Sequence, residues 1–212
     1  MIELNDTLSN EAQPAFVQPH VTSSAVFNED CMLVMKRYPD KFFNLAIVDP
    51  PYGVNAGKKT KYHAGAFTSY TAKDWDNVRP TAEYFAELVR ISEYQIIWGG
   101  NYFVEFLPVH KNWIVWDKAQ PLGISLSMHE LAFCNAPGQA PIFRVTNGSN
   151  GNRCVVKDAS KKYQRIHPTQ KPIKLYDYCL KQFAKKGWKI IDTHLGSGSS
   201  RIACKKAGLD FV

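Results

Sequence analysis

The residues best suited to chemistry stand at the end of an apolar run, in the stretch Asp49-Pro50-Pro51-Tyr52. Residues 45–48 before it are typical of a buried strand, yet neither proline can donate an N–H to a sheet. The carboxylate of Asp49 and the carbonyl of Pro50 are two acceptors, which suit an –NH₂ group with two N–H to donate. Tyr52 adds a flat face that can stack on an aromatic ring. The stretch predicts a pocket for the exocyclic amine of a nucleobase; the alternative is a capping aspartate in a proline-stiffened turn.

A second candidate site lies near the C-terminus, in the sequence KIIDTHLGSGSSRIAC (189–204). The pattern is that of a strand, an acid, a glycine-rich turn and a helix, and its candidate residues are Asp192, Gly196, Ser197 and Gly198. Glycines let the backbone approach a ligand closely, and a helix N-terminus favours negative charge. The turn matches neither the phosphate loop G-x-x-x-x-G-K-[ST] nor a full G-x-G-x-x-G. It indicates a nucleotide-like ligand, with a purely structural turn as the alternative.

A third candidate is RIHPTQKP (165–172). His167, Thr169 and Lys171 place polar donors directly before a helix that Pro172 is expected to open. Donors at a helix N-terminus form a natural site for a carboxylate. The alternative is an ordinary N-cap made by Thr169 or Gln170.

These motifs need elements to hold them, and the hydrophobic pattern predicts alternating strands and helices. Strands are expected at 24–28, 45–49, 94–98, 112–116, 129–134 and 188–192. Helices are expected at 30–38, from Pro80, from Pro172, and after Ser200 through about Lys206. Such alternation is typical of an α/β fold with a mainly parallel, twisted sheet flanked by helices. We expect one domain over 24–212 after a flexible leader, 1–23. Within the domain, 53–76 is predicted to be a mobile loop and 135–165 an insertion.

Composition narrows the class of protein. The 212 residues are 45% hydrophobic and 21% charged, which is typical of a globular protein. No apolar run approaches the roughly 20 residues of a membrane helix, and the N-terminus has no signal-peptide pattern, so we expect a cytoplasmic protein. Five scattered cysteines without a C-x-x-C pair favour reduced thiols. The histidines show no metal-binding spacing, so no metal is expected.

The net charge of +7 favours a polyanionic partner such as nucleic acid, with a solvated basic surface as the alternative. The basic residues cluster in two segments that are expected to be loops. The candidate DNA-binding residues are Lys58, Lys59, Lys61, Arg153, Lys161, Lys162 and Arg165.

Taken together, the motifs DPPY, HPTQKP and DTHLGSGSS resemble those of the S-adenosylmethionine-dependent DNA amino-methyltransferases. Their order, with the catalytic motif first and the cofactor motif last, resembles the β class, a circular permutation of the usual arrangement. The stretches QIIWGGNYF, WIVWDK and HELAFC also look like the middle strands of that family, so the resemblance covers 24–212. It implies a Rossmann-like class I methyltransferase domain and S-adenosylmethionine as cofactor. The implied partner is double-stranded DNA in a restriction–modification or phage setting, and a homodimer is compatible with it.

The resemblance also implies roles for residues of this sequence. The catalytic residues would be Asp49, Pro50, Pro51 and Tyr52: the first two hold the target amine, and Tyr52 stacks on a base flipped out of the duplex. The residues implied around the cofactor are Asp30, His167, Thr169, Lys171, Asp192, Gly196, Ser197 and Gly198. In this assignment the glycine turn lines the methionine end, the HPTQKP segment helps to hold its carboxylate, and Asp30 lies near the adenine. The segment 135–165 occupies the usual place of target recognition.

In that family DPPY accompanies mostly adenine N6 and SPPY mostly cytosine N4, so the resemblance favours adenine. Cytosine N4 and RNA are alternatives, whereas C5-cytosine chemistry is excluded because none of the cysteines follows a proline. Two departures stand out. Thr193 and His194 occupy positions where many relatives have Pro and Phe. The chain also ends at Val212 before the acid that grips the cofactor ribose, with Asp210 expected in a turn. We therefore expect a fragment; weak cofactor binding, completion of the sheet by another chain, and an inactive DNA-binding remnant are the alternatives.

Overall fold

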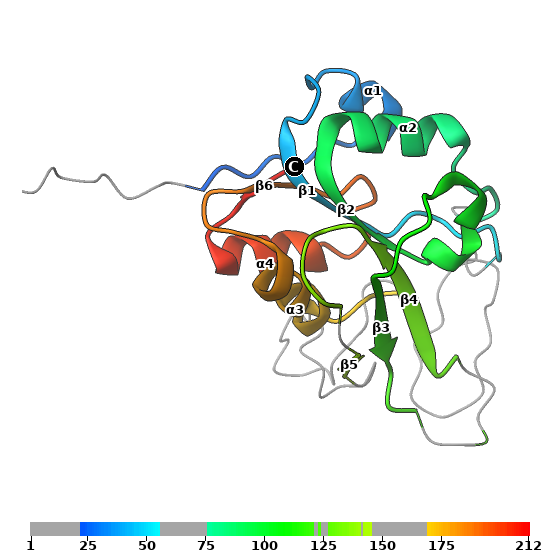
Figure 1. Ribbon diagram of the computed structural model, residues 1–212. Helices are drawn as coiled ribbons and strands as arrows, with labels where there is room; N and C mark the ends of the chain where they lie inside the picture. Colours follow the sequence, from blue (N-terminus) through cyan, green and yellow to red (C-terminus); the bar gives the residue numbers. More distant parts are fainter. Residues whose placement is uncertain (1–21, 56–75, 121–122, 124–126, 141, 146–168) are drawn as a thin grey trace, which may run out of the picture.

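The computed structural model describes residues 22–55, 76–120, 123, 127–140, 142–145 and 169–212. Its centre is a seven-stranded sheet with the order β5-β3-β4-β2-β1-β6-β7 (Figure 1). The strands are β1 (Phe43–Val48), β2 (Ser92–Trp98), β3 (Trp113–Asp117), β4 (His129–Cys134), β5 (Phe143–Arg144), β6 (Lys189–Ile191) and β7 (Asp210–Phe211). Four of the six neighbouring pairs are parallel, and β4 runs antiparallel to both β2 and β3. The expected mainly parallel α/β sheet is confirmed, with β4 as its reversed strand.

Strand β1 lies in the interior of the sheet and ends at the first candidate site. It pairs in parallel with β2 on one side and β6 on the other, so that Leu45 lies opposite both Tyr94 and Ile190. All of its residues except Asn44 are buried. A strand covered on both faces has no polar side to present, which explains its continuous apolar sequence.

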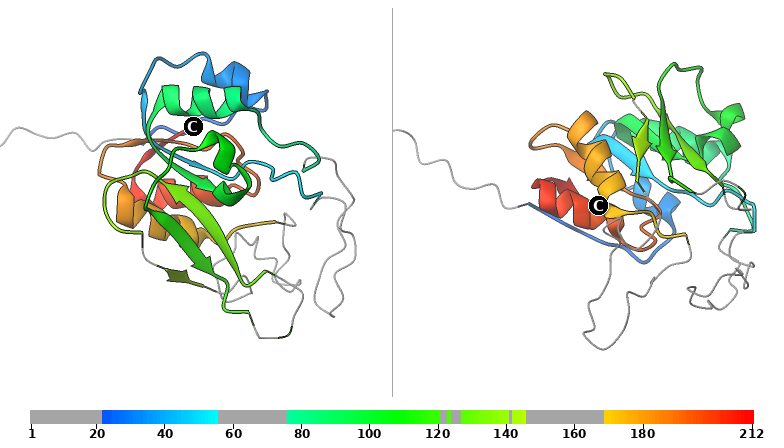
Figure 2. Two further views of the ribbon diagram at one scale, coloured as in Figure 1. Left: turned by 45° about the vertical axis from the view of Figure 1, so that its right-hand side comes forward. Right: turned by 90° about the horizontal axis from the view of Figure 1, so that it is seen from below.

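Helices cover both faces of the sheet. Helices α1 (Cys31–Met35) and α2 (Ala82–Ile91) lie on one face, and α3 (Ile173–Phe183) and α4 (Ser199–Ala207) lie on the other (Figures 1 and 2). Two short 3₁₀ turns, η2 (Gly100–Tyr102) and η3 (Val104–Phe106), follow β2. Each helical layer closes its own buried apolar cluster against the sheet.

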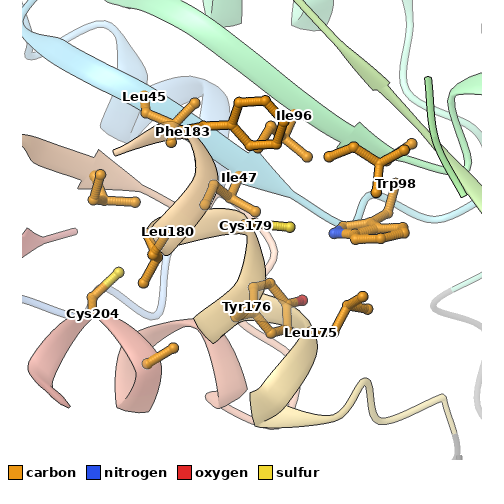
Figure 3. Close-up of a cluster of buried hydrophobic side chains, with 14 of the residues drawn as sticks. Leu45, Ile47, Ile96, Trp98, Leu175, Tyr176, Cys179, Leu180, Phe183 and Cys204 are labelled. Carbon is orange, nitrogen blue, oxygen red and sulfur yellow. The ribbon is translucent and has the colours of Figure 1, made fainter. Parts of the chain in front are cut away.

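Helix α3 shows how the sequence pattern builds one of these layers. Its side chains Leu175, Tyr176, Cys179, Leu180 and Phe183, spaced three and four apart, are all buried against the sheet as predicted (Figure 3). Burying side chains of this size stabilises the fold by roughly 1.5–3 kcal/mol each. Helix α3 thereby fastens the segment before it, which carries Lys171, to the centre of the molecule.

Two expectations about the sheet edge are wrong. Residues 24–28 do not form a strand; only Ser24 makes an isolated bridge, to Phe211 of β7. Asp210 lies in β7 and not in a turn, and its carboxylate accepts a hydrogen bond from the Ser23 amide at 2.8 Å. The reason is that Gly208 ends α4 in a left-handed conformation, φ 68°, so the chain reverses at once and the strand starts two residues later.

The segment 135–165 is not wholly an insertion. Its residues Phe143 and Arg144 form β5, which pairs in parallel with the end of β3 and forms one edge of the sheet. The Trp116 indole donates to the Val145 carbonyl at 2.9 Å and fixes this strand in place. A two-residue strand held by its pairing with β3, by the Arg144–Asp117 ion pair and by stacking of Phe143 on Tyr178 depends on distant residues and has no local signature of its own.

The predicted leader up to residue 21, the loop residues 56–75 and residues 146–168 lie outside the described part of the chain. In the part described, no helix is both long and apolar enough to cross a membrane. The four cysteines within it, Cys31, Cys134, Cys179 and Cys204, are free thiols, as expected.

Candidate functional site

The DPPY corner follows directly on β1, at the edge where the parallel strands β1, β2 and β6 end together. Gly99, at the end of β2, makes room for it. A Cβ at Gly99 would lie 2.2 Å from the Tyr52 ring, and its φ of 68° is in the left-handed region that favours glycine. Gly99 is therefore explained by the close approach of Tyr52 to the backbone, whereas a Cβ at Gly100 would meet Phe133 at 2.8 Å.

Asp76 holds the corner in shape from the far end of the predicted loop. Its carboxylate accepts hydrogen bonds from the amides of Tyr52 at 2.7 Å and Gly53 at 3.0 Å. The residue is buried, so these bonds are shielded from water. Sequence reasoning missed this residue, because an aspartate 24 positions away gives no local sign that it will meet the turn.

The Tyr52 ring is packed between aromatic and polar partners. It stacks on Tyr102 with ring centroids 5.1 Å apart, and Phe103 meets it edge-on. Its hydroxyl donates to Asp49 Oδ1 at 2.6 Å. Burial, together with the nearby Asp49 carboxylate, raises the pKa of Tyr52 well above its usual value, so the phenol keeps its proton.

Lys171 joins the HPTQKP segment to the same corner. Its ammonium lies 2.5 Å from Asp49 Oδ1 and 3.0 Å from the Tyr52 hydroxyl. Burial disfavours the charge, but the carboxylates of Asp49 and Glu130 outweigh it and raise the pKa of Lys171. The resemblance assigns Lys171 to the carboxylate of the cofactor, whereas in the structure its ammonium contacts Asp49. The Lys171 carbonyl accepts a hydrogen bond from Ser199 Oγ at 2.9 Å.

Glu130 and Lys118 extend this ion pair into a chain of four charges. Glu130 Oε2 lies 3.1 Å from the Lys171 ammonium, and Oε1 lies 2.6 Å from the Lys118 ammonium. Burial would raise the pKa of Glu130, but the two lysines prevail and lower it. Neither residue was singled out from the sequence, although a glutamate beginning the otherwise apolar stretch of HELAFC was a usable signal.

The glycine turn after β6 forms the second half of the site. The buried carboxylate of Asp192 accepts from the His194 amide at 3.0 Å and from Ser200 Oγ at 2.6 Å. Burial raises the pKa of Asp192 to about 6. Gly196 and Gly198 have φ values of 53° and 74°, and Gly198 is the N-cap of α4. The turn could not form this way with bulky residues at those two positions.

A cavity opens beside Asp192, with about 490 Å³ of empty space including the part open to solvent. The lining is largely apolar and comes from the N-terminal segment, α1 and the ends of β6 and β7: Ala25, Val26, Phe27, Glu29, Cys31, Val34, Met35, Ile191, Asp192, Thr193, Leu195, Phe211 and Val212. Asp30 is not in this lining, because its carboxylate caps α1 by accepting from the Met32 amide at 2.7 Å. Its neighbours Glu29 and Cys31 reach the cavity.

The sequence profile of the N6/N4 DNA methylase family, described as DNA methylase, matches residues 43–212. The chain belongs to the N6/N4 DNA methylase family. Its cofactor is S-adenosylmethionine. The class I methyltransferase fold expected from the sequence is confirmed.

Solved structures show the same fold. The PvuII DNA methyltransferase, titled cytosine-N4-specific, has a TM-score of 0.56 at 10% identity, over 90% of this chain and 80% of that chain. The complex of M1.HpyAVI with SAM has a TM-score of 0.53 at 17% identity, over 90% and 91% of the two chains. At such identities the likeness concerns the fold alone. No curated protein is significantly similar to this chain.

Within this methylase, Thr193 and His194, which stand where many relatives have Pro and Phe, form a chain of polar contacts with Tyr84. Thr193 Oγ1 lies 2.6 Å from the Tyr84 hydroxyl and 2.9 Å from His194 Nδ1. Burial lowers the pKa of His194 to about 4, so the imidazole is neutral at pH 7. The structure thus ties the glycine turn to α2 by polar contacts.

Several predicted site residues of this methylase fall outside the described part of the chain. These are His167 and the DNA-binding candidates Lys58, Lys59, Lys61, Arg153, Lys161, Lys162 and Arg165. Thr169 is described and lies exposed just before α3. Ser197 lies in the glycine turn, where its hydroxyl is 3.0 Å from Ser199 Oγ. Among the described residues no group of His, Cys, Asp and Glu is arranged to hold a metal ion.

Proposed function

We propose that this methylase transfers a methyl group from S-adenosylmethionine to the N6 amine of an adenine flipped out of double-stranded DNA. The observation that carries the proposal is that the DPPY corner and the glycine turn, the two half-sites, lie side by side at the C-terminal ends of neighbouring parallel strands. Asp49 follows β1 and Asp192 follows β6, and these strands are hydrogen-bonded neighbours with Ala46 opposite Ile191. A base at the first half-site therefore lies next to a ligand at the second.

The cavity beside Asp192 suits the cofactor. Its apolar walls, including Phe27, Val34 and Met35, are suited to the flat adenine, and the buried carboxylate of Asp192 is suited to a positively charged methionine end. When bound there, S-adenosylmethionine would supply a methyl group on a sulfonium, which is already a good leaving group. The protein then has only to place the amine and to stabilise the charge that moves onto it.

Asp49 and the Pro50 carbonyl are the groups proposed to hold the target amine. Each accepts one N–H, which directs the nitrogen lone pair toward the methyl group. As the new N–C bond forms and the S–C bond breaks, the nitrogen gains positive charge, and the carboxylate of Asp49 stabilises it before the surplus proton leaves. In the structure Asp49 Oδ1 already accepts from Tyr52 and Lys171. The amine therefore takes the place of the Tyr52 hydroxyl, and Tyr52 becomes free to stack on the base.

The choice of adenine over cytosine N4 rests on the aspartate of DPPY. The amine of cytosine offers the same two N–H as that of adenine. The two target bases therefore differ at this site only in the ring that stacks on Tyr52. The test is to incubate the protein with the cofactor and unmethylated DNA, digest the DNA and identify the nucleosides by mass spectrometry. We expect N6-methyldeoxyadenosine. N4-methyldeoxycytidine would refute the choice of base, and no methylated nucleoside from DNA would refute the proposed function.

The matched variant is Asp49→Ala. We expect transfer to fall below detection, because the developing charge loses its carboxylate, while thermal unfolding stays cooperative. A variant that still methylates DNA at the wild-type rate would show that the site is elsewhere.

A further inference from the structure

We propose that Glu130 is a positioning residue for methyl transfer, which holds the Lys171 ammonium and balances its charge so that Asp49 stays available to the target amine. This inference rests on the proposed function. The observation behind it is that four charged groups alternate in sign through the site. In order they are Asp49, Lys171, Glu130 and Lys118, joined by contacts of 2.5, 3.1 and 2.6 Å.

The four groups come from separate parts of the chain and meet in a largely buried place. Asp49 follows β1, Lys118 follows β3, Glu130 lies on β4 and Lys171 precedes α3. Their side chains are exposed by 20%, 10%, 25% and 4%, respectively. Two positive and two negative charges give a net charge of zero. With so little water present, a change in any one of them is felt by the others.

Lys171 is the member that needs a second carboxylate. The Lys171 ammonium donates hydrogen bonds to Asp49 Oδ1 and the Tyr52 hydroxyl, and Glu130 Oε2 lies 3.1 Å away as its second charged partner. If Asp49 were the only charged partner of Lys171, the target amine would have to compete with that ion pair for Asp49. Binding of the amine would then leave the buried Lys171 ammonium without a counter-charge. Glu130 supplies that counter-charge, so Lys171 can loosen its contact with Asp49 without losing its charge.

The sign of the charge also matters for the reaction itself. Transfer moves a positive charge onto a nitrogen held by Asp49, and an uncompensated lysine at the same carboxylate would oppose it. Glu130 lies between the two lysines and offsets them. A purely structural role explains the arrangement less well, since buried ion pairs seldom stabilise a fold more than apolar side chains do. Glu130 is next to Leu131 on a strand whose last three residues, Ala132 to Cys134, are buried and apolar.

The test is Glu130→Gln, which keeps the size of the side chain and removes its charge. At saturating DNA and cofactor we expect kcat to fall about 10- to 100-fold, in the range found when catalytic groups are slightly misplaced. The KM for DNA and the Kd for the cofactor should change less than twofold, because the charged partners of Glu130 are Lys118 and Lys171 and it does not line the cavity proposed for the cofactor. The alkaline limb of the pH profile of kcat should move to lower pH, because Lys171 loses a partner that favours its protonated form.

A second variant separates charge from shape. In Glu130→Gln combined with Lys118→Met, the remaining charges again sum to zero, but Lys171 still lacks its second counter-charge. We therefore expect kcat to recover at least threefold over the single variant and to stay below that of the wild type. The control is Glu87→Gln, which breaks a comparable ion pair, 2.9 Å to Arg90, on helix α2. We expect this variant to keep the wild-type kcat.

The outcomes separate the two ideas. If the wild-type protein methylates DNA and Glu130→Gln keeps a kcat within threefold of it, the inference is refuted and the proposed function stands. A further loss in the double variant would likewise refute charge balance. If the wild-type protein methylates no DNA, both fail together.

Discussion

Replacing Gly99 with alanine tests whether a glycine is needed there to make room for Tyr52. The new Cβ would meet the Tyr52 ring at 2.2 Å, and the backbone would have to keep a φ of 68°. The left-handed conformation costs a non-glycine residue about 1–2 kcal/mol, and overpacking costs about 1–3 kcal/mol more. We expect the free energy of unfolding to fall by about 2–5 kcal/mol, measured by urea denaturation followed by tryptophan fluorescence.

Gly208→Ala is a matched control, because this glycine has the same φ of 68° but no atom within 4 Å of the added Cβ. It should lose only the conformational part, about 1–2 kcal/mol. The difference between the two variants measures the clash with Tyr52 alone. Since that clash displaces the tyrosine from Asp49, methyl transfer should also fall in Gly99→Ala and not in Gly208→Ala. Equal losses of stability in the two variants would refute the close approach.

Two further predictions concern the carboxylates that hold each half-site. The affinity for S-adenosylmethionine, measured by calorimetry, should weaken as the pH falls below about 6, because the raised pKa of Asp192 leaves its carboxyl neutral there. Asp192→Asn should remove this pH dependence. An affinity that does not change with pH in the wild type would contradict the role of Asp192. Asp76→Ala should lower the free energy of unfolding by about 1–3 kcal/mol, because the amides of Tyr52 and Gly53 are left without their acceptor, and an unchanged urea midpoint would contradict it.

Much of the fold could be predicted because its signals are local. The apolar run of β1 reflects burial on both faces of the sheet, and the three-and-four spacing of α3 reflects its one buried face. The errors lie where contacts between distant residues decide the structure. The segment at Ser24 and the strand at Asp210 contact each other although 187 positions separate Ser23 from Asp210. The conformation of each segment therefore depends on the other. Strand β5 depends in the same way on Trp116.

The candidate site shows the same division. The DPPY corner and the glycine turn are continuous motifs, so their residue types and spacing could be read directly. The partners of Asp49 could not, because Lys171 is 122 residues away and Glu130 reaches Asp49 only through that lysine. Lys171 was found, but as a ligand of the cofactor carboxylate. A motif identifies which residues matter, whereas the tertiary structure decides which of them touch.

The contacts within the DPPY corner also satisfy polar groups that are partly shielded from water, because Asp49 and Tyr52 are both half-buried. The Asp49 carboxylate accepts hydrogen bonds and the Tyr52 hydroxyl donates one. Shielding either group from water without a partner would cost free energy. The Tyr52 hydroxyl donates to Asp49 at 2.6 Å, and the Tyr52 ring stacks on Tyr102. Under the proposed function, the amine of the base must replace the hydrogen bond that the Tyr52 hydroxyl donates to Asp49. A ring that lacks an amine could not do so, and we expect it to be rejected for that reason.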